Sequence, residues 1–220
     1  MKFLGLLVSL VMALGLTACG DDDSGNGDKG SKGGSGDGGY AQPEGPAPDL
    51  STLEGGTTPL KAANGGAYPD ACSVLSEEMV LKLLPAAGED GEAGVQRSSE
   101  DQNGTPYMCQ YFSGTADDEN VGFIIVSFDQ NAAVVDRAVV EDAFNSSKEA
   151  AADDEDFVDY KDELGAGSDA FFDGVKVNVL VGGMMFDVTA SGTEPSKDDK
   201  ALWRDNVDVP VAENMLSRLQ

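Results

Sequence analysis

The sequence contains no histidine, and this absence excludes several common kinds of chemistry. Ser-His-Asp and Cys-His catalysis both need an imidazole, and so does a zinc site with histidine ligands. The sequence also has no Gly-x-Ser-x-Gly elbow, no Walker loop and no Cys-x-x-Cys pair. These absences favour a protein that is not an enzyme, and they predict no cofactor and no resident metal.

Basic residues are scarce. The chain has 14 Lys and Arg against 40 Asp and Glu, for a formal net charge of −26 at pH 7. Such a charge argues against nucleic acid as a partner, because phosphates need a basic surface. It also argues against electrostatic adhesion to anionic lipid. An acidic surface favours solubility and could attract cations or basic partners.

Long hydrophobic runs are missing as well. The stretch from Phe3 to Leu16 is too short for a membrane-spanning helix, which needs ~20 apolar residues. It follows Lys2 and ends in small residues, a pattern typical of a secretory signal. Leu16-Thr17-Ala18-Cys19 resembles the lipobox of bacterial lipoproteins.

That resemblance implies cleavage before Cys19, so that residues 1–18 are a lipoprotein signal peptide. It also implies a diacylglyceryl group on the Cys19 thiol and a lipid-anchored location on the extracytoplasmic face of the cell membrane. The alternative is an ordinary signal peptide that happens to precede a cysteine.

Residues 19–67 contain almost no core-forming side chains. They are rich in Gly, Ser and Asp, and then in Pro. Such residues bury too little apolar area to offset chain entropy, so the segment is predicted to be a disordered tether. The tether would hold the following domain away from the membrane.

Two cysteines remain besides Cys19. Cys72 and Cys109 form an even pair in a chain predicted to be exported, which favours one disulfide. A metal site is the weaker alternative, because two thiolates without histidine supply too few ligands.

Residues 68–220 are long enough for one domain with its own core. The hairpin at residues 170–179 is expected to turn at Asp173-Gly174, and residues 182–183 to form another turn. The expected fold is α+β, with an antiparallel sheet that helices cover on one face. The expected elements are helices at 77–84, 132–150, 198–205 and 212–219, the last two separated near Pro210, and strands at 107–113, 121–128, 170–179 and 184–189.

The helix at 132–150 is expected to turn one apolar side toward the core. Val135, Val139 and Ala143 recur at helical spacing, and charged residues occupy the other positions. These three residues are therefore the predicted buried stripe.

Three short motifs occur in a familiar order: Pro69 to Leu75 around Cys72, Cys109-Gln110-Tyr111, and Leu164 to Ala170. With the lipobox, they resemble the actinobacterial lipoproteins grouped as domain of unknown function 3558. The family usually has tryptophan where Tyr111 stands, and Ser168 is an insertion in its glycine-rich turn. The resemblance implies location and fold but no reaction. More distantly, the layout is similar to the two-cysteine sensor domains of mycobacterial receptor kinases, which would imply ligand or partner binding.

Four acidic residues are candidates for general acid–base chemistry. Asp162 and Glu163 lie near Asp169 and Asp173, at the mouth of the predicted hairpin. Acidic residues near turns more often cap helices or form the turns themselves.

Two apolar features could bind a ligand or a partner. Trp203 could be a stacking platform, although a core or interface role is favoured on a helical stripe. Met184-Met185-Phe186 could face a partner, and a core strand is the favoured alternative.

The sequence thus predicts a membrane-anchored extracytoplasmic lipoprotein whose domain binds an envelope protein or a small ligand. The alternative is a structural or stress-protective envelope component. A third hypothesis is a carboxylate-based hydrolase.

Overall fold

The computed structural model describes residues 42–43, 45–84, 93–113, 122–130, 136–192 and 198–219. The predicted signal peptide, Cys19 and the first part of the predicted tether lie outside the described residues. The structural unit that contains the described residues runs from Gly38 to Gln220.

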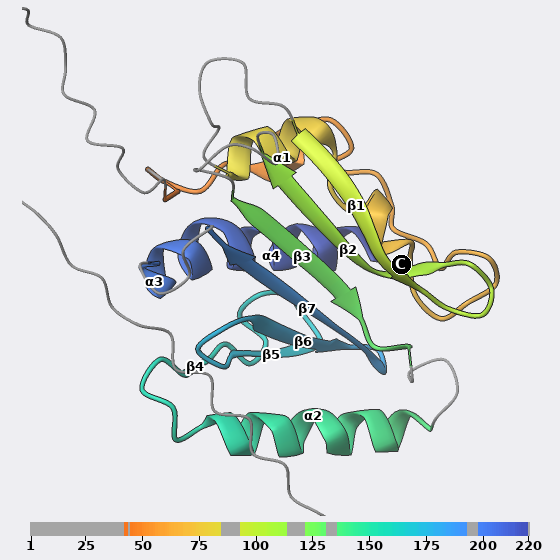
Figure 1. Cartoon of the computed structure of the whole chain (residues 1–220). Coiled ribbons are helices and arrows are strands. Elements are labelled where there is room, and N and C mark those ends of the chain that lie inside the picture. The colour runs from red at the N-terminus through yellow and green to blue at the C-terminus, as the bar shows by residue number, and fades with distance from the viewer. Residues whose placement is uncertain are drawn as a thin grey trace, which may run out of the picture. The chain divides into compact units, whose positions relative to one another are not determined.

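An antiparallel sheet of seven strands lies at the centre of this unit (Figure 1), in the order β1-β2-β3-β7-β6-β5-β4. Every neighbouring pair in the sheet is antiparallel. The strands are β1 (Ala93–Glu100), β2 (Pro106–Ser113), β3 (Phe123–Phe128), β4 (Val158–Asp159), β5 (Ser168–Phe172), β6 (Val177–Val181) and β7 (Met184–Ser191).

Helical segments lie before, between and after the strands. Helix α1 begins where expected, because the Ser76 side chain accepts a hydrogen bond from the Met79 N–H. The helical segments are η1 (Leu50–Thr52), η2 (Ala71–Ser73), α1 (Glu77–Leu83), α2 (Arg137–Ala151), α3 (Lys200–Trp203), the π-helical turn η5 (Arg204–Asp208) and α4 (Val209–Arg218).

One face of the sheet carries the main hydrophobic core. Successive strand residues point to opposite faces, so Ile124, Val126 and Phe128 of β3 all enter this core. Val80 of α1 and Met215 of α4 belong to the same cluster, and α4 runs behind the sheet in Figure 1. The predicted α+β class with an antiparallel sheet is confirmed, whereas the helices are not confined to one face as predicted, because α2 packs on the other side.

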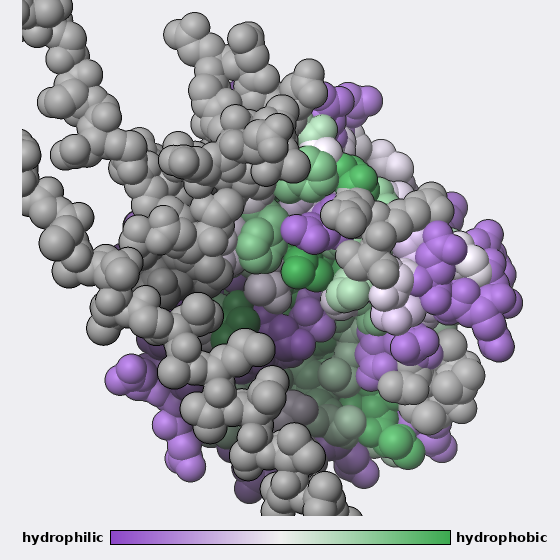
Figure 2. All heavy atoms as spheres, viewed as in Figure 1, coloured by the Kyte–Doolittle hydropathy of each residue, from purple (hydrophilic) through white to green (hydrophobic). Residues whose placement is uncertain are grey.

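Helix α2 adds cover on the opposite face, near the β5 end of the sheet. Phe171 lies between Ala170 and Phe172, two residues of the main core, so its side chain leaves β5 on the other side. There the Phe171 ring meets Phe144 of α2 edge-on, with 5.1 Å between ring centroids. The strands farther from α2 show hydrophobic residues among hydrophilic ones on this face (Figure 2).

The predicted buried stripe of the α2 region was wrong. Val139 is 53 % exposed and Ala143 is exposed, whereas Val140 and Phe144 are buried. Phe144 is the largest apolar side chain of the helix, and Val140 lies one turn before it on the same face. Burying this pair turns Val139 toward solvent. Val135 lies outside the described residues.

The folded part of the chain starts earlier than the predicted boundary at Tyr68. Leu50 and Leu60 are both buried in the main core, at 3 % and 4 % exposure. The backbone at Leu60 also forms a parallel bridge with Leu219 near the other end of the chain. Leu50 and Leu60 thus pack this otherwise polar segment against the domain. The tether prediction is therefore corrected for residues 50–67.

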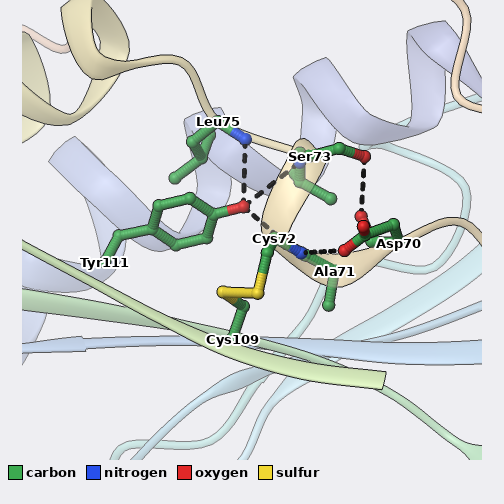
Figure 3. Close-up of a disulfide and its surroundings, with 8 residues drawn as sticks. Asp70, Ala71, Cys72, Ser73, Leu75, Cys109 and Tyr111 are labelled. Atoms are coloured by element: carbon green, nitrogen blue, oxygen red, sulfur yellow. Dashed lines mark hydrogen bonds between the residues drawn. A yellow bond between two sulfur atoms is a disulfide. The ribbon is translucent and has the colours of Figure 1, made fainter. Parts of the chain in front are cut away.

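The predicted disulfide between Cys72 and Cys109 is confirmed (Figure 3). It joins η2 to β2, with 5.1 Å between the Cα atoms and 37 residues between them in sequence. On the chain-entropy argument, closing a loop of this length stabilises the fold by up to about 4 kcal/mol. The bridge fastens the segment before α1 to the edge of the main core.

The turn predicted at Asp173-Gly174 lies one residue later. Phe172 pairs with Val177, and the Asp173 N–H donates to the Lys176 carbonyl at 3.2 Å, so Gly174 and Val175 connect the strands. The Asp173 carboxylate accepts the backbone N–H of Lys176 at 2.9 Å. A side chain that bonds its own turn in this way competes with the type I′ geometry.

The next turn has the tight geometry. Val181 pairs with Met184, so only Gly182 and Gly183 connect the strands. Both glycines have positive φ, at 58° and 86°, as a type I′ turn requires.

Candidate functional site

The four acidic residues considered for catalysis have separate structural roles. Asp169 lies 2.7 Å from Lys148 Nζ in an ion pair with α2. Asp173 caps the β5–β6 loop, and Asp162 and Glu163 are exposed. Within the described residues, no hydrogen bond joins these carboxylates into an acid–base pair.

The apolar run at Met184 belongs to a core strand on one side. Phe186 is buried in the main core and its ring lies 6.0 Å from that of Phe128. Met184 packs against the same core, and Met185 is half-buried on the other face. The favoured alternative, a core strand, therefore describes this segment.

Trp203 lines a cavity that is a better candidate for a binding site. Its side chain is only 2 % exposed, as the core interpretation predicts, yet it lines a cavity of about 140 Å³. We name this cavity the Asp208 pocket. Its walls come from the end of β5 with the following loop, from the end of β7, and from α3 with η5, and include Phe172, Ala190, Ser191, Asp198, Trp203 and Asp208.

The position of the β5–β6 turn explains why the pocket lies here. β6 begins at Val177, which pairs with Val188 of β7. Residues 189–191 of β7 therefore extend beyond their β6 neighbour and have no strand beside them on that side. The backbone N–H of Ala190 bonds the Asp208 side chain instead. The Asp208 side chain thus accepts a backbone hydrogen bond that a neighbouring strand would otherwise accept.

Asp208 reaches the pocket because the helix after α3 changes its pitch. The Val209 N–H bonds the carbonyl of Arg204, five residues back, so η5 is a π-helical turn. Pro210 has no N–H and removes one further α-helical bond. The prediction of two helices separated near Pro210 was therefore wrong, because the helix continues through the wider π turn into α4. Such π turns are frequent at functional sites.

Two buried polar atoms of the Asp208 pocket lack partners. Trp203 Nε1 and Asp208 Oδ1 have no hydrogen bond to any described residue. Both residues are at most 2 % exposed, and both line the same cavity. An unbonded buried polar group costs about 1–3 kcal/mol. A bound polar molecule in the cavity would remove that cost.

Burial also changes the charge of Asp208. Desolvation raises the pKa of its carboxyl well above the ordinary aspartate range, and the nearby Asp173 carboxylate raises it further. The Ala190 N–H and the Arg204 guanidinium act in the opposite direction and are outweighed. A carboxyl in this state is protonated over a wider pH range, and its O–H can donate a hydrogen bond.

Asp198 is a second carboxylate at the pocket wall, but it is already engaged by the end of β7. Its Oδ2 atom accepts the Ser191 hydroxyl at 2.7 Å and the Gly192 N–H at 3.2 Å. Asp198 therefore holds the end of β7 in place. The pocket offers one carboxyl with an open position, not two.

Lys200 is the basic residue at the wall, and it is paired elsewhere. Its Nζ atom lies 2.7 Å from Asp156 Oδ2, and its side chain is about half exposed. The ammonium is therefore already neutralised by an acidic partner from the α2–β4 connection.

The sequence analysis missed Asp208, although a signal was present. Trp203, Val207, Val211 and Met215 recur every four residues as an apolar helical stripe, and Asp208 lies directly beside it. An acidic residue next to a buried stripe, two positions before a proline, marks an unusual place in a helix. The pocket itself could not be predicted, because it depends on the β5–β6 loop.

No helix among the described residues is long and apolar enough to cross a bilayer. In the same part of the chain, no group of three or more Cys, Asp or Glu residues is placed to hold a metal ion.

No protein-family model matches the sequence, and neither a curated protein nor a solved structure is similar to it. The resemblance to the domain of unknown function 3558 lipoproteins therefore stays a prediction.

Proposed function

We propose that this chain is a lipid-anchored extracytoplasmic protein whose domain binds a small ligand in the Asp208 pocket. The lipobox at Cys19 supports the anchor, and the confirmed disulfide is consistent with an oxidising compartment. The pocket supports the binding role.

One observation carries the proposal: Trp203 Nε1 and Asp208 Oδ1 are buried, have no partner among the described residues, and belong to residues that line the same cavity. A protein that served only as a spacer or an acidic coat would have no use for this arrangement, because it costs stability. Binding sites combine apolar walls with a few converging polar groups in this way.

The other two hypotheses have less support. Hydrolysis by paired carboxylates needs two carboxyl groups with open positions, and Asp198 is bonded to the end of β7. A purely structural envelope component remains the outcome to expect if the pocket binds nothing.

The single tryptophan allows a direct test, because the chain has only one indole N–H resonance. The full chain carrying Cys19→Ala would be labelled with ¹⁵N and titrated with a library of ring-sized fragments. We expect some fragments to shift the Trp203 indole resonance. Ala190→Leu, which fills the pocket, should abolish the shifts.

Ala138→Leu is the matched control, because Ala138 is exposed in the first turn of α2. It should leave every shift in place. An indole resonance that no fragment moves in the folded protein would contradict the binding proposal and favour the structural role.

A further inference from the structure

The size of the Asp208 pocket limits what it can hold. Its volume is about 140 Å³. An engineered apolar cavity of about 150 Å³ holds one benzene molecule. A ligand that enters this pocket completely is therefore a single small ring or a branched aliphatic group of similar volume.

Most of the wall is apolar. Phe172, Val175 and Ala190 surround the cavity together with the indole of Trp203. Arg204 does not contribute a free charge, because its guanidinium lies over the Phe172 ring at 5.6 Å and pairs with Asp205. Such walls favour an apolar body with few polar atoms.

The two unpartnered polar atoms, Trp203 Nε1 and Asp208 Oδ1, favour a ligand that carries an oxygen. An indole N–H can only donate a hydrogen bond. A protonated Asp208 carboxyl can also donate, and burial keeps its pKa raised. Trp203 and Asp208 both line the cavity, so these two donors are suited to a single hydrogen-bond-accepting oxygen, such as that of a hydroxyl or a carbonyl.

The charges around the pocket disfavour an anionic ligand. Asp173 acts electrostatically on Asp208, Asp198 stands at the wall, and Lys200 is paired with Asp156. An anion would meet two carboxylates without a free cation among the described wall residues. An ammonium ligand has no lone pair to accept the Trp203 Nε1–H hydrogen bond, so it would leave that donor unpaired.

We propose that the Asp208 pocket selects small uncharged molecules, with a ring-sized apolar body and one hydrogen-bond-accepting oxygen, bound by Trp203 Nε1–H and Asp208. This inference rests on the proposed function, because it names the ligand class of the same site.

Four matched probes test the ligand class: phenol, benzene, benzoate and benzylammonium. Each would be titrated into the full chain carrying Cys19→Ala, with the Trp203 indole resonance as the readout. We expect phenol to bind at least tenfold more tightly than benzene, since one hydrogen bond contributes about 1.4 kcal/mol, or a factor of ten. The two charged probes should bind more weakly than phenol.

Trp203→Phe separates the hydrogen bond from simple packing. It removes the N–H but keeps an aromatic ring, and binding would be followed by ligand-observed NMR. Phenol affinity should fall about tenfold while benzene affinity stays unchanged. Equal losses for both probes would show that Trp203 only shapes the cavity and would overturn the assignment. If this variant does not fold, Asp208→Leu makes the same comparison.

The outcomes distinguish this inference from the proposed function. If benzoate binds best and Lys200→Met weakens it, or if benzylammonium binds best, the pocket is a binding site but its ligand class is wrong. If no probe and no fragment moves the Trp203 resonance, both proposals fail.

Discussion

The Tyr111 hydroxyl forms hydrogen bonds with three backbone groups close to the disulfide (Figure 3). The oxygen accepts the N–H groups of Val74 at 3.1 Å and Leu75 at 3.3 Å, and it donates to the Ala71 carbonyl. Burial raises the pKa of the Tyr111 hydroxyl, so it remains a neutral donor and acceptor. The residue therefore orders the chain between η2 and α1, beside the disulfide.

Tyr111→Phe should lower the free energy of unfolding by about 1–3 kcal/mol, because it leaves buried N–H groups without an acceptor. Denaturant unfolding measured by circular dichroism checks this. Tyr107→Phe is the matched control on the same strand, and its hydroxyl makes none of these three bonds. Equal stability of Tyr111→Phe and the parent would contradict this role.

Asp208 gives the domain a defined pH dependence. Its pKa is raised in the folded state, so the folded protein binds this proton more tightly than the unfolded chain does. Its contribution to stability is therefore fully present below about pH 4, the unfolded pKa. It is lost as pH rises through the folded pKa.

Asp208→Asn keeps the shape and cannot ionise. Its free energy of unfolding should lack the decline that the parent shows above about pH 4, and at neutral pH it should exceed the parent value. Thermal melts across the pH range measure both quantities. Asp142→Asn, at an exposed site on α2, should follow the parent curve. A parent-like curve for Asp208→Asn would contradict the assignment.

At the scale of elements, the end of α4 fastens the N-terminal segment to the domain. Arg218 Nε donates to the Thr58 carbonyl and its Nη1 to the Val74 carbonyl, both at 2.8 Å. Asn214, one turn earlier, donates to the Gly56 carbonyl at 2.9 Å. Together these bonds make a polar segment part of the fold.

Arg218→Met should release that segment, because it leaves two carbonyls without their donor. We expect faster amide hydrogen exchange at residues 56–60 and a loss of about 1–3 kcal/mol in stability. Arg137→Met is the control, because its pair with Glu141 is exposed and such pairs contribute about 0–1 kcal/mol. Unchanged exchange at residues 56–60 would show that Leu50 and Leu60 alone hold the segment.

At the scale of the whole molecule, the predicted lipid anchor is consistent with the acidic charge. A chain with a net charge of −26 is repelled by anionic lipid headgroups, so a covalent anchor is the means of attachment that the sequence favours. Two acyl chains give stable attachment where one is marginal.

Cys19→Ala should therefore move the protein from the membrane fraction to the soluble fraction of its producing cell, as measured by fractionation and immunoblotting. Cys72→Ala is the matched cysteine control. It removes the disulfide but leaves the lipobox intact, and the protein should stay with the membrane. A Cys19→Ala protein that remains membrane-bound would contradict the anchor.

The sequence alone determined the features that depend on local pattern or on counting. The strand patterns predicted β2 and β3, and the Ser76 cap predicted the start of α1. The even pair of cysteines that remains besides Cys19 predicted the disulfide. Each of these signals lies within a few residues or within the composition, so no tertiary contact was needed to detect it. The α+β class followed from the order of the elements.

Only the tertiary structure decided the buried side of α2, the start of the domain and the Asp208 pocket. Phe144 is buried and Val139 is exposed because the Phe171 ring packs against Phe144. Leu50 and Leu60 count as core because α4 meets them from the far end of the chain. Asp208 became a candidate site only where β6 begins at Val177 and a π turn brings the Asp208 carboxyl to the β7 edge. Such contacts join residues far apart in sequence, and no local pattern encodes them.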